Sequence, residues 1–453
     1  MEVNSKTIKC LLEGHGKFIK HAEEAKRYYE NRNKITREGT NIYKDPNTAE
    51  VNPLRLADNR ISHDWHRLLV TQKIGYLLTY PPTFDIGSAS ANDKVLQTLG
   101  DDFPEVSAAL GVDASNCGVG WLHYWRGNDG TFRYHIVDPT QVIPVFSDRL
   151  GSEVVAVLRC YTQLNPETGY IEEISEYWDD QKVRFYKKNT NGNYAYFDYP
   201  EIGEEMVHKM GAVPFIPFYN NGDHMSDLIL YKDLIDAYDK VVSGFANDME
   251  DVQEIIFVIK NYGGQDKTEF MQDLKASKLI KVDNEGGVDT IRAEIPYEAR
   301  GAFLDRIRKQ IFVSGMGVDP DPQQFGTASG VALKYLYSLL ELKAGLMETQ
   351  FRKSYAQLIR AICRYHGMSE PAKITQTWTR NAIQNDLETA QIAQQSMGVI
   401  SDKTILKNHP WVEDAESEQK QLEKEAADGE KKQEQYRFPA LNQEKPPEAD
   451  PDE

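Results

Sequence analysis

The sequence predicts an α+β protein that is mainly helical. Two segments, 226–252 and 333–362, carry hydrophobic residues at spacings of three and four, which indicates long amphipathic helices. Within 93–218 a short helical piece is followed by aromatic and β-branched runs separated by turn residues, which is typical of strands. With 453 residues and 40% hydrophobic content, the chain can form two to four domains with a sizeable core.

The N-terminal region is expected to be mostly helical. Charged residues alternate with tyrosines over 21–35, and a second helical pattern over 59–80 ends at Pro81 and Pro82. In the strand-rich region, Asn191-Gly192 lies between two aromatic runs and predicts a β-hairpin.

A compact insertion separates the predicted long helices. Ser226 is a suitable N-cap for the first helix. Residues 255–296 then alternate strand and helix patterns, so they predict a small α/β module, and 297–313 form a second helix. A polar, glycine-rich stretch, GMGVDPDPQQFGTASG at 315–330, precedes the longest helix. The remainder, 374–436, is predicted to be polar and helical.

Composition excludes several classes of protein. The net charge of -18 argues against a broad basic surface that grips nucleic acid, although an acidic surface suits a protein past which DNA must slide. The 437–453 tail is acidic and predicted to be disordered. Four widely separated cysteines predict free thiols, and neither a membrane span nor a signal peptide is visible, so we expect synthesis in a cytoplasm.

Motifs for catalysis and cofactor binding are incomplete. Asp266 stands where a phosphate-binding loop needs the glycine before Lys267. His63 and His66 lack a third metal ligand, and Asp319 and Asp321 lack the rest of a calcium loop. We therefore expect no enzyme, no cofactor and no metal.

The order of the predicted elements, together with four stretches of sequence, resembles the portal proteins of tailed bacteriophages, in the family typified by long-tailed phages of Gram-positive hosts. The four stretches occupy 59–84, 213–251, 279–300 and 326–353. They read NRISHDWHRLLVTQKIGYLLTYPPTF, VPFIPFYNN with SDLILYKDLIDAYDKVVSGFANDMED, LIKVDNEGGVDTIRAEIPYEAR, and GTASGVALKYLYSLLELKAGLMETQFRK.

The resemblance implies a ring, usually of twelve subunits, at one capsid vertex of the virion, through which double-stranded DNA enters and later leaves. It also implies a portal fold with named parts. These are a wing at 1–225, stem helices at 226–254 and 297–314, a clip at 255–296, a tunnel loop at 315–330, a long wing helix at 331–367, a crown at 368–436 and the acidic tail.

Site residues follow from those parts. In the tunnel loop, Gln323, Gln324, Gly326, Thr327 and Ser329 would contact DNA weakly, and the loop has no lysine or arginine to stall it. An ordinary connector between helices is the alternative, although such connectors are usually shorter. The other candidates are the stem residues Arg306, Arg308 and Lys309, the clip residues Lys267, Lys275 and Lys278, and the apolar positions Phe303, Ile307, Leu336, Leu340 and Met347.

The apolar stripes of the stem and long helices are expected to be covered by neighbouring subunits, with Ala299, Phe303, Ile307 and Ile311 on one face of the second stem helix. The clip strands are expected to pair partly with neighbours. Its lysines would dock partners, or else merely face solvent. The implied partners are the terminase large subunit, the head–tail adaptor, and the major capsid and scaffolding proteins. Alternatives are another virion component, such as a minor capsid or connector protein, and an enzyme of the packaging motor.

Overall fold

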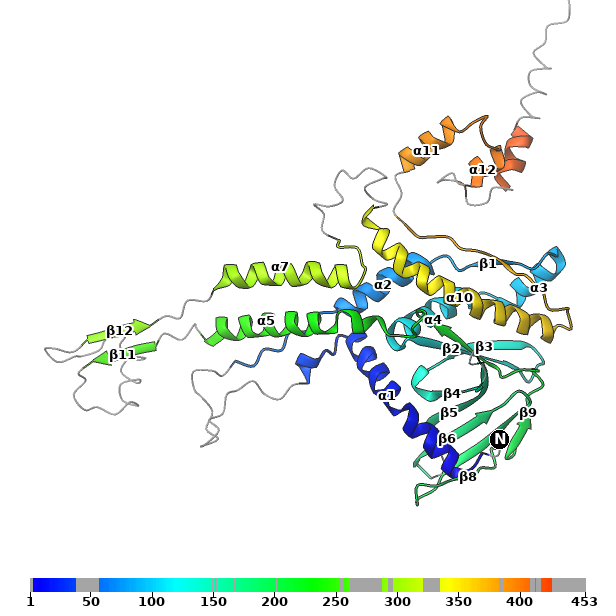
Figure 1. The fold of residues 1–453 in the computed structure, drawn as a ribbon, viewed down its shortest axis with the longest axis horizontal. Helices are drawn as coiled ribbons and strands as arrows, with labels where there is room; N and C mark the ends of the chain where they lie inside the picture. Colours follow the sequence, from blue (N-terminus) through cyan, green and yellow to red (C-terminus); the bar gives the residue numbers. More distant parts are fainter. Residues whose placement is uncertain are drawn as a thin grey trace, which may run out of the picture. The chain divides into compact units, whose positions relative to one another are not determined.

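The computed structural model describes most of the chain. The described residues are 3–37, 57–148, 150, 153–166, 168–200, 202–251, 256–260, 287–291, 296–320, 335–382, 386–407, 412 and 417–425. The chain divides into two compact units, of which the first comprises Met1–Asp321 and Leu336–Asn381, and the second Pro322–Tyr335 and Ala382–Glu453 (Figure 1).

Helices make up the first part of the first unit. They are α1 (Ser5–Tyr29), η1 (Lys34–Thr36), α2 (Trp65–Leu77), α3 (Ala89–Leu99) and α4 (Phe103–Cys117). Helix α1 begins with a side-chain cap, because Asn4 accepts a hydrogen bond from the Thr7 amide. The single helical piece expected at 93–110 is in fact α3 and α4, which are separated at Gly100 because its φ of 64° is not helical.

Two antiparallel sheets follow. The three-stranded sheet has the order β10-β2-β3, and the larger sheet has the order β4-β5-β6-β7-β8, with β9 also paired to β7. The strands are β2 (Val119–Arg126), β3 (Phe132–Val137), β4 (Val142–Phe146, after the short η2 at Pro139–Gln141), β5 (Val154–Leu164), β6 (Ile171–Trp178), β7 (Lys182–Lys188), β8 (Tyr194–Tyr196), β9 (Glu205–Val207) and β10 (Phe215–Tyr219). The hairpin predicted at Asn191-Gly192 is confirmed, since β7 and β8 pair on either side of Gly192, whose φ is 73°.

Alternation along the strands of the larger sheet divides its side chains between two cores. On β5, Val157 packs with Trp121 and Phe215 of the three-stranded sheet. Its neighbours Ala156 and Leu158 face the other way, into a cluster that includes residues of α1. The larger sheet is therefore covered on one face by the smaller sheet and on the other by α1.

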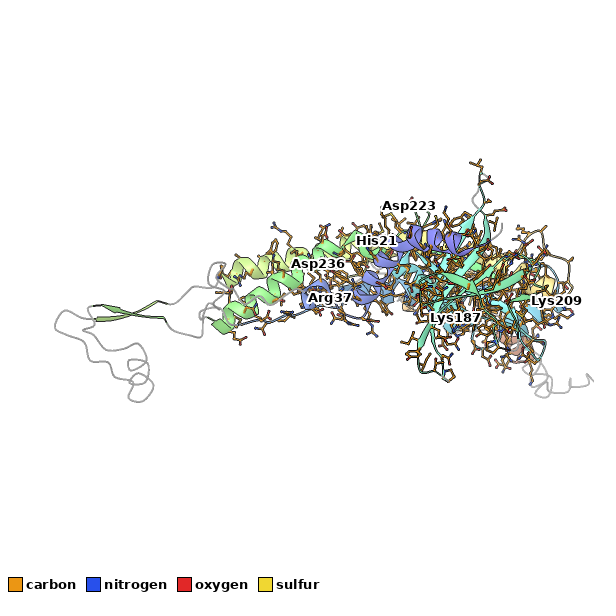
Figure 2. All side chains as sticks on the ribbon, turned by 90° about the horizontal axis from the view of Figure 1, so that it is seen from below. His21, Arg37, Lys187, Lys209, Asp223 and Asp236 are labelled. Carbon is orange, nitrogen blue, oxygen red and sulfur yellow. The ribbon has the colours of Figure 1, made fainter. Side chains whose placement is uncertain are left out.

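The two helices predicted around the insertion lie side by side in both views (Figures 1 and 2). They are α5 (Lys232–Asp251) and α7 (Tyr297–Ser314), and Arg300 of α7 forms an ion pair with Asp248 of α5. Ser226 does act as a cap, but for the 3-10 turn η3 (Asp227–Leu230) and not for α5 itself. At Tyr231 a φ of -144° separates the two elements.

The strands of the insertion pair with each other. β11 (Ile256–Lys260) and β12 (Gly287–Ile291) are antiparallel, with Ile256 opposite Ile291. In this pair, β11 and β12 of the same chain each use one edge to hydrogen-bond to the other strand. Pairing with a neighbouring subunit, as the sequence led us to expect, could use only the opposite edges.

The longest helix, α10 (Ser338–Tyr365), crosses the three-stranded sheet. Phe351 and Tyr355 of α10 pack edge-on against Phe218 of β10, and the Ser354 hydroxyl donates to the Pro217 carbonyl oxygen at 2.5 Å. Its predicted apolar stripe is buried against the same chain. The members of that stripe that are fully buried are Leu340, Ala344, Met347, Phe351, Tyr355, Leu358 and Ile362.

The region predicted as a polar helical end begins differently. β13 (Thr375–Thr377) pairs with β1 (Thr83–Asp85), and Arg380 forms ion pairs with Glu341 and Glu348 of α10. These contacts bring residues up to Asn381 into the first unit, whereas the sequence had suggested a boundary at 368. The second unit contains α11 (Asp386–Gln395), α12 (Asp402–Lys407) and a helical segment at 417–425.

Among the described helices, none has the length and apolar content that crossing a bilayer requires.

Candidate functional site: the junction at the root of the 315–330 loop

Only the start of the predicted loop belongs to the described residues. Gln323, Gln324, Gly326, Thr327 and Ser329 lie outside them. Lys267, Lys275 and Lys278 of the insertion lie outside them as well. The structure does describe residues 315–320, where the loop leaves α7, and the chain from 335, where it enters α10. The site is therefore built from this junction, which we call the loop root.

Helix α7 ends in a Schellman motif. The Gly317 amide donates to the Phe312 carbonyl at 2.9 Å, and the Met316 amide donates to the Val313 carbonyl at 3.2 Å. Met316 takes the left-handed position of this motif, with a φ of 51°, where glycine is the usual residue. The chain direction at the loop root is thus set by defined backbone hydrogen bonds.

The two glycines of the loop root permit close packing. A Cβ atom at Gly315 would lie 2.5 Å from Leu69 Cδ1, and one at Gly317 would lie 2.3 Å from Leu69 Cδ2. Both distances are too short for a Cβ atom, so the Leu69 side chain of α2 packs directly against the backbone of the loop root. These two glycines therefore fix the loop root, because they let it pack against Leu69.

A glutamine of α2 holds the next residue of the loop. The Val318 amide donates to Gln72 Oε1 at 3.1 Å, and Gln72 Nε2 donates to the Val318 carbonyl oxygen at 2.7 Å. Val318 itself is buried. The side-chain amide thus satisfies both backbone groups of an irregular buried residue, as a neighbouring strand would.

Beneath the loop root lies a buried ionic cluster. Lys73 of α2 and Lys343 of α10 approach the same oxygen of Asp227, at 2.6 Å and 3.1 Å. Asn220 donates to the other Asp227 oxygen at 2.8 Å and accepts from Lys73 at 2.7 Å. All three charged side chains are buried, so the cluster places two ammonium groups and one carboxylate out of contact with water.

The second positive charge is compensated by the loop root itself. Lys343 Nζ donates to the Gly315 carbonyl oxygen at 2.8 Å. That carbonyl belongs to the C-terminal end of α7, where the unpaired carbonyl groups carry partial negative charge. One ammonium group therefore connects the end of α7 with Asp227, which opens the segment leading into α5.

The charges shift the pKa values within the cluster. Burial by itself would raise the pKa of the Asp227 carboxyl, but Lys343 and Lys73 together bring it below its ordinary value. Burial lowers the pKa of the Lys73 ammonium to about 8, against the opposing effect of Asp227. The Asp227 carboxyl is consequently ionised at neutral pH, and the cluster retains its ionic character.

A neutral histidine borders this cluster. Burial lowers the pKa of His66 to about 4. The Tyr231 hydroxyl lies 2.7 Å from His66 Nδ1, and Asn116 Oδ1 lies 2.9 Å from Nε2, so the ring carries its proton on Nε2. His63 faces Asp239 instead. The two histidines therefore have separate structural partners.

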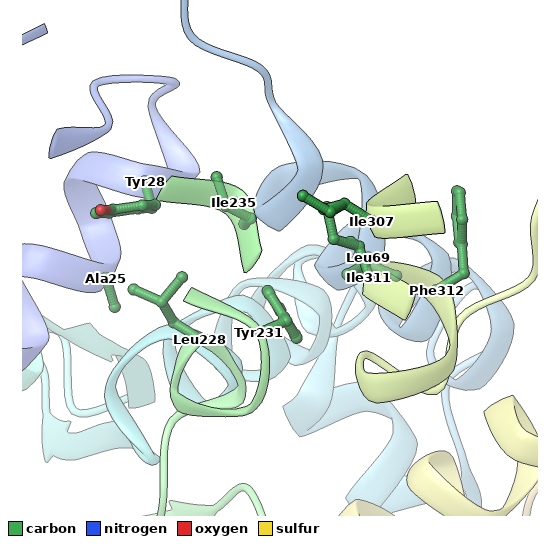
Figure 3. Close-up of a cluster of buried hydrophobic side chains, with 9 residues drawn as sticks. All are labelled: Ala25, Tyr28, Leu69, Leu228, Tyr231, Ile235, Ile307, Ile311 and Phe312. Carbon is green, nitrogen blue, oxygen red and sulfur yellow. The ribbon is translucent and has the colours of Figure 1, made fainter. Parts of the chain in front are cut away.

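Apolar side chains from four helices and η3 form a buried cluster that reaches the loop root through Leu69 and Phe312 (Figure 3). Leu69 of α2 packs with Ile311 and Phe312 of α7 in this cluster, and Ala25 and Tyr28 of α1 lie on the opposite side of the cluster. The complete buried set is Ala25, Tyr28, Leu69, Leu228, Tyr231, Ile235, Ile307, Ile311 and Phe312.

Helix α2 also holds the returning side of the loop. The Tyr76 hydroxyl donates to Glu341 Oε2 at 2.6 Å, and its ring stacks on Tyr337 at 5.6 Å. Leu69, Gln72, Lys73 and Tyr76 recur at helical spacing and thus share one face of α2. That face contacts both the segment entering the loop and the helix leaving it.

The predicted stem residues differ in their surroundings. Arg308 forms an ion pair with Asp319 at 2.6 Å, which attaches the loop root to the flank of α7. Arg306 and Lys309 are exposed. Of the face predicted for α7, Ile307 and Ile311 are buried together with Phe312, whereas Ala299 and Phe303 nearer its start are exposed.

The apolar residues assigned to subunit contacts divide into two groups. The chain itself buries Ile307, Leu340 and Met347, which are therefore core residues of one subunit. Leu336 is half-buried, and Phe303 is exposed. The expectation that neighbours cover the main stripe of α10 is corrected, because β10, α2 and other elements of the same chain already cover it.

Comparison with known proteins identifies the family. The model of the family described as "Phage portal protein, SPP1 Gp6-like" matches residues 8–432. The chain belongs to the phage portal protein family. It is 42% identical over 420 residues to the portal protein of Clostridium phage phiCD119, covering 88% of this chain and 90% of that protein. It is 33% identical over 419 residues to the portal protein of Bacillus phage SPP1, covering 88% and 82%.

Membership of the portal family confirms the resemblance seen in the sequence, including the Gram-positive hosts of the relatives. Portal proteins are structural components of the virion and assemble as homo-oligomeric rings. The sequence pattern alone does not predict the loop root, because Gln72 and Lys73 resemble ordinary polar positions of a helix. A signal was present, since Lys73 and Lys343 both occupy apolar helical faces, where an unpaired lysine is unusual.

Proposed function

We propose that this portal subunit joins others in a ring at one capsid vertex, and that its 315–330 loop lines the channel for double-stranded DNA. The observation that carries this proposal is the loop root. Both sides of the loop are fixed to one face of α2, through Gln72 on one side and Tyr76 on the other. A loop with firmly held ends and no lysine or arginine between Gly315 and Ala332 suits a surface that guides DNA without retaining it.

The elements fit the parts of a portal subunit under this proposal. The wing is assigned to 1–225, the stem to α5 and α7, the clip to 255–296, and the long wing helix to α10. The crown is reduced to residues after Asn381, in keeping with the second compact unit. Gln323, Gln324, Gly326, Thr327 and Ser329 remain the candidates for weak contacts with DNA.

For the contact between subunits we propose the exposed side of α10. Leu339, Leu342 and Leu346 lie on one face, with exposed fractions of 38%, 65% and 54%. Three leucines in this arrangement form an apolar stripe on the helix, opposite its buried face. Phe303 on α7, 48% exposed, is a second candidate for the same role.

The clip is proposed as the docking surface for the terminase large subunit and the head–tail adaptor, with Lys267, Lys275 and Lys278 as candidate contacts. The major capsid and scaffolding proteins are proposed to meet the outside of the ring. Reversing the charge of all three lysines should impair packaging or tail joining while rings still form. Normal packaging and tail joining would reject the docking role.

Electron microscopy of the purified full-length protein tests the central proposal. Rings with an open channel are expected, with twelve subunits as the proposed number. Native mass measurement of the same sample gives the subunit number directly. A purified protein that stays monomeric under all assembly conditions, or that packages no DNA when supplied with its motor, would contradict the proposal.

A further inference from the structure

The Lys343 ammonium is the one described group that contacts both Asp227, ahead of α5, and Gly315, at the end of α7. It also lies on α10, which the chain enters after the loop. A single side chain thus connects the beginning of the first stem helix, the end of the second and the helix beyond the loop. Packing of the helices does not depend on these contacts, because apolar residues already fill the neighbouring cluster. The contacts of Lys343 therefore add a polar connection between the three segments.

The charge balance of the cluster shows why Lys343 differs from Lys73. Each lysine by itself would balance Asp227, so either could be absent without leaving an uncompensated charge. Lys73 finds its additional acceptor in Asn220, a side chain close to Asp227 in sequence. Lys343 finds its additional acceptor in the Gly315 carbonyl, which moves with the loop root.

From these contacts we infer that Lys343 is a positioning residue that clamps the loop root to the stem and to α10. The inference rests on the proposed role of the loop in the DNA channel. A shift of α7 relative to α10 would remove the Gly315 carbonyl from the ammonium and leave a buried positive charge without its acceptor. The cluster therefore favours one register of the two stem helices and holds the loop at a fixed origin.

Replacing a buried ionic group by an apolar side chain of similar volume is often neutral for stability, so a role in fixing the arrangement needs a test of its own. Lys343→Met keeps a side chain of similar length, leaves the Lys73–Asp227 pair balanced and removes the hydrogen bond to Gly315. The thermal midpoint should change little, because the surplus buried charge is removed while the buried Gly315 carbonyl loses its donor, and these two effects oppose each other. A midpoint close to that of the wild type shows that the variant folds, so the loosening of the loop root is measured locally.

The decisive measurement is amide hydrogen exchange of residues 315–318 in assembled rings of the full-length chain. In Lys343→Met, exchange there should rise at least tenfold, with little change in the β2 and β10 strands. Lys73→Met is the matched variant, since it also leaves one balanced pair but keeps the Gly315 contact. Its exchange at 315–318 should stay within about twofold of the wild type.

DNA transport provides the second readout. Packaging by Lys343→Met rings should fall at least fivefold, whereas Lys353→Met, an exposed lysine on the same helix, should package like the wild type. Lys343→Met rings that package DNA as well as wild-type rings, with amide exchange at 315–318 unchanged, would overturn the clamp. The proposed function would still stand in that case, because the wild-type rings package DNA. If wild-type rings fail to package, the proposed function fails, and the exchange experiment still decides whether the clamp exists.

Discussion

The side-chain amide of Gln72 pairs with both backbone groups of Val318, at 3.1 Å and 2.7 Å, and so fixes the first irregular residues after α7. Replacing Gln72 by Leu keeps a side chain of similar volume but leaves the buried backbone amide and carbonyl of Val318 without partners. The free energy of unfolding should fall by about 1–3 kcal/mol. Chemical denaturation measures this loss, and faster amide exchange at Val318 would locate it.

The control for this change is Gln97→Leu, at an exposed position of α3, which should alter stability by no more than about 0.5 kcal/mol. Equal stabilities for the wild type and the Gln72 variant would show that water replaces the amide at no cost, and that the loop root is held by packing instead.

A second prediction compares two glycines on either side of the loop. Gly317→Ala would place a Cβ atom 2.3 Å from Leu69 Cδ2, so either the buried Leu69 side chain or the loop root must shift. We expect a loss of about 1–3 kcal/mol from this overpacking. Gly345→Ala lies within α10 and meets nothing within 4 Å, so it should stabilise the protein by up to about 1 kcal/mol. Thermal unfolding of both variants checks the opposite signs, and a Gly317→Ala protein of undiminished stability would contradict the close approach.

Stability should decrease in mild acid, partly through His66. Burial lowers the pKa of its imidazole to about 4 from an ordinary value of 6.5. Between these two values the unfolded chain binds a proton that the folded chain does not, so the free energy of unfolding falls as the pH drops through this window. Integrated over the whole interval, the contribution amounts to roughly 3 kcal/mol.

His66→Gln can keep hydrogen bonds to Tyr231 and Asn116 without titrating. Its unfolding free energy should therefore depend less steeply on pH between 6.5 and 4 than that of the wild type. His135→Gln, at an exposed position of β3, serves as the control and should leave the slope unchanged. Denaturant titrations at several pH values give the slopes, and parallel curves for wild type and His66→Gln would refute the assignment.

The sequence predicted the main helices of this portal protein well, because apolar residues recur at helical spacing wherever one face of a helix is buried, as along most of α10. It also predicted the strands with long aromatic runs and the hairpin at Gly192. The pairing of β1 with β13 escaped prediction, since three-residue strands carry almost no periodic signal and depend on contacts between distant segments. The loop root escaped for a related reason: Gln72, Lys73 and Lys343 acquire their roles only when three helices meet.

Subunit contacts show the same limit. The spacing of Leu340 and Met347 places them on one apolar face of a helix. It does not indicate whether the same chain or a neighbouring subunit covers that face. The structure shows that the chain covers both, and it exposes Leu342 instead. Leu342→Asp should give a folded chain that fails to form rings, whereas Leu340→Asp should lower the stability of the subunit by several kcal/mol, because it buries an unpaired charge.

Light scattering coupled to size-exclusion chromatography, together with thermal melts, separates these two outcomes. Intact rings from Leu342→Asp would remove the exposed stripe of α10 from the interface and leave Phe303 as the remaining candidate. Phe303→Asp provides the parallel test on α7.

The last prediction concerns the loop beyond its root, whose candidate residues lie outside the described part of the chain. If the loop is an uncharged guide, replacing Gln323 or Gln324 by Lys would put about twelve positive charges around the DNA in a ring of the proposed size. Each phosphate contact releases counterions, so binding should become tighter and steeply dependent on salt. Packaging should therefore slow or stop at low salt and recover partly as the salt concentration rises.

Assembly of these lysine variants should remain normal, because the residues that fix the loop root, from Gln72 to Lys343, are untouched. Gly326→Pro should also impair transport, but through stiffness, so its defect should not respond to salt. Gln323→Asn preserves the polar, uncharged character and should be nearly silent. Normal packaging rates with lysine at both glutamine positions would exclude the loop from the path of the DNA and leave it a long connector between α7 and α10.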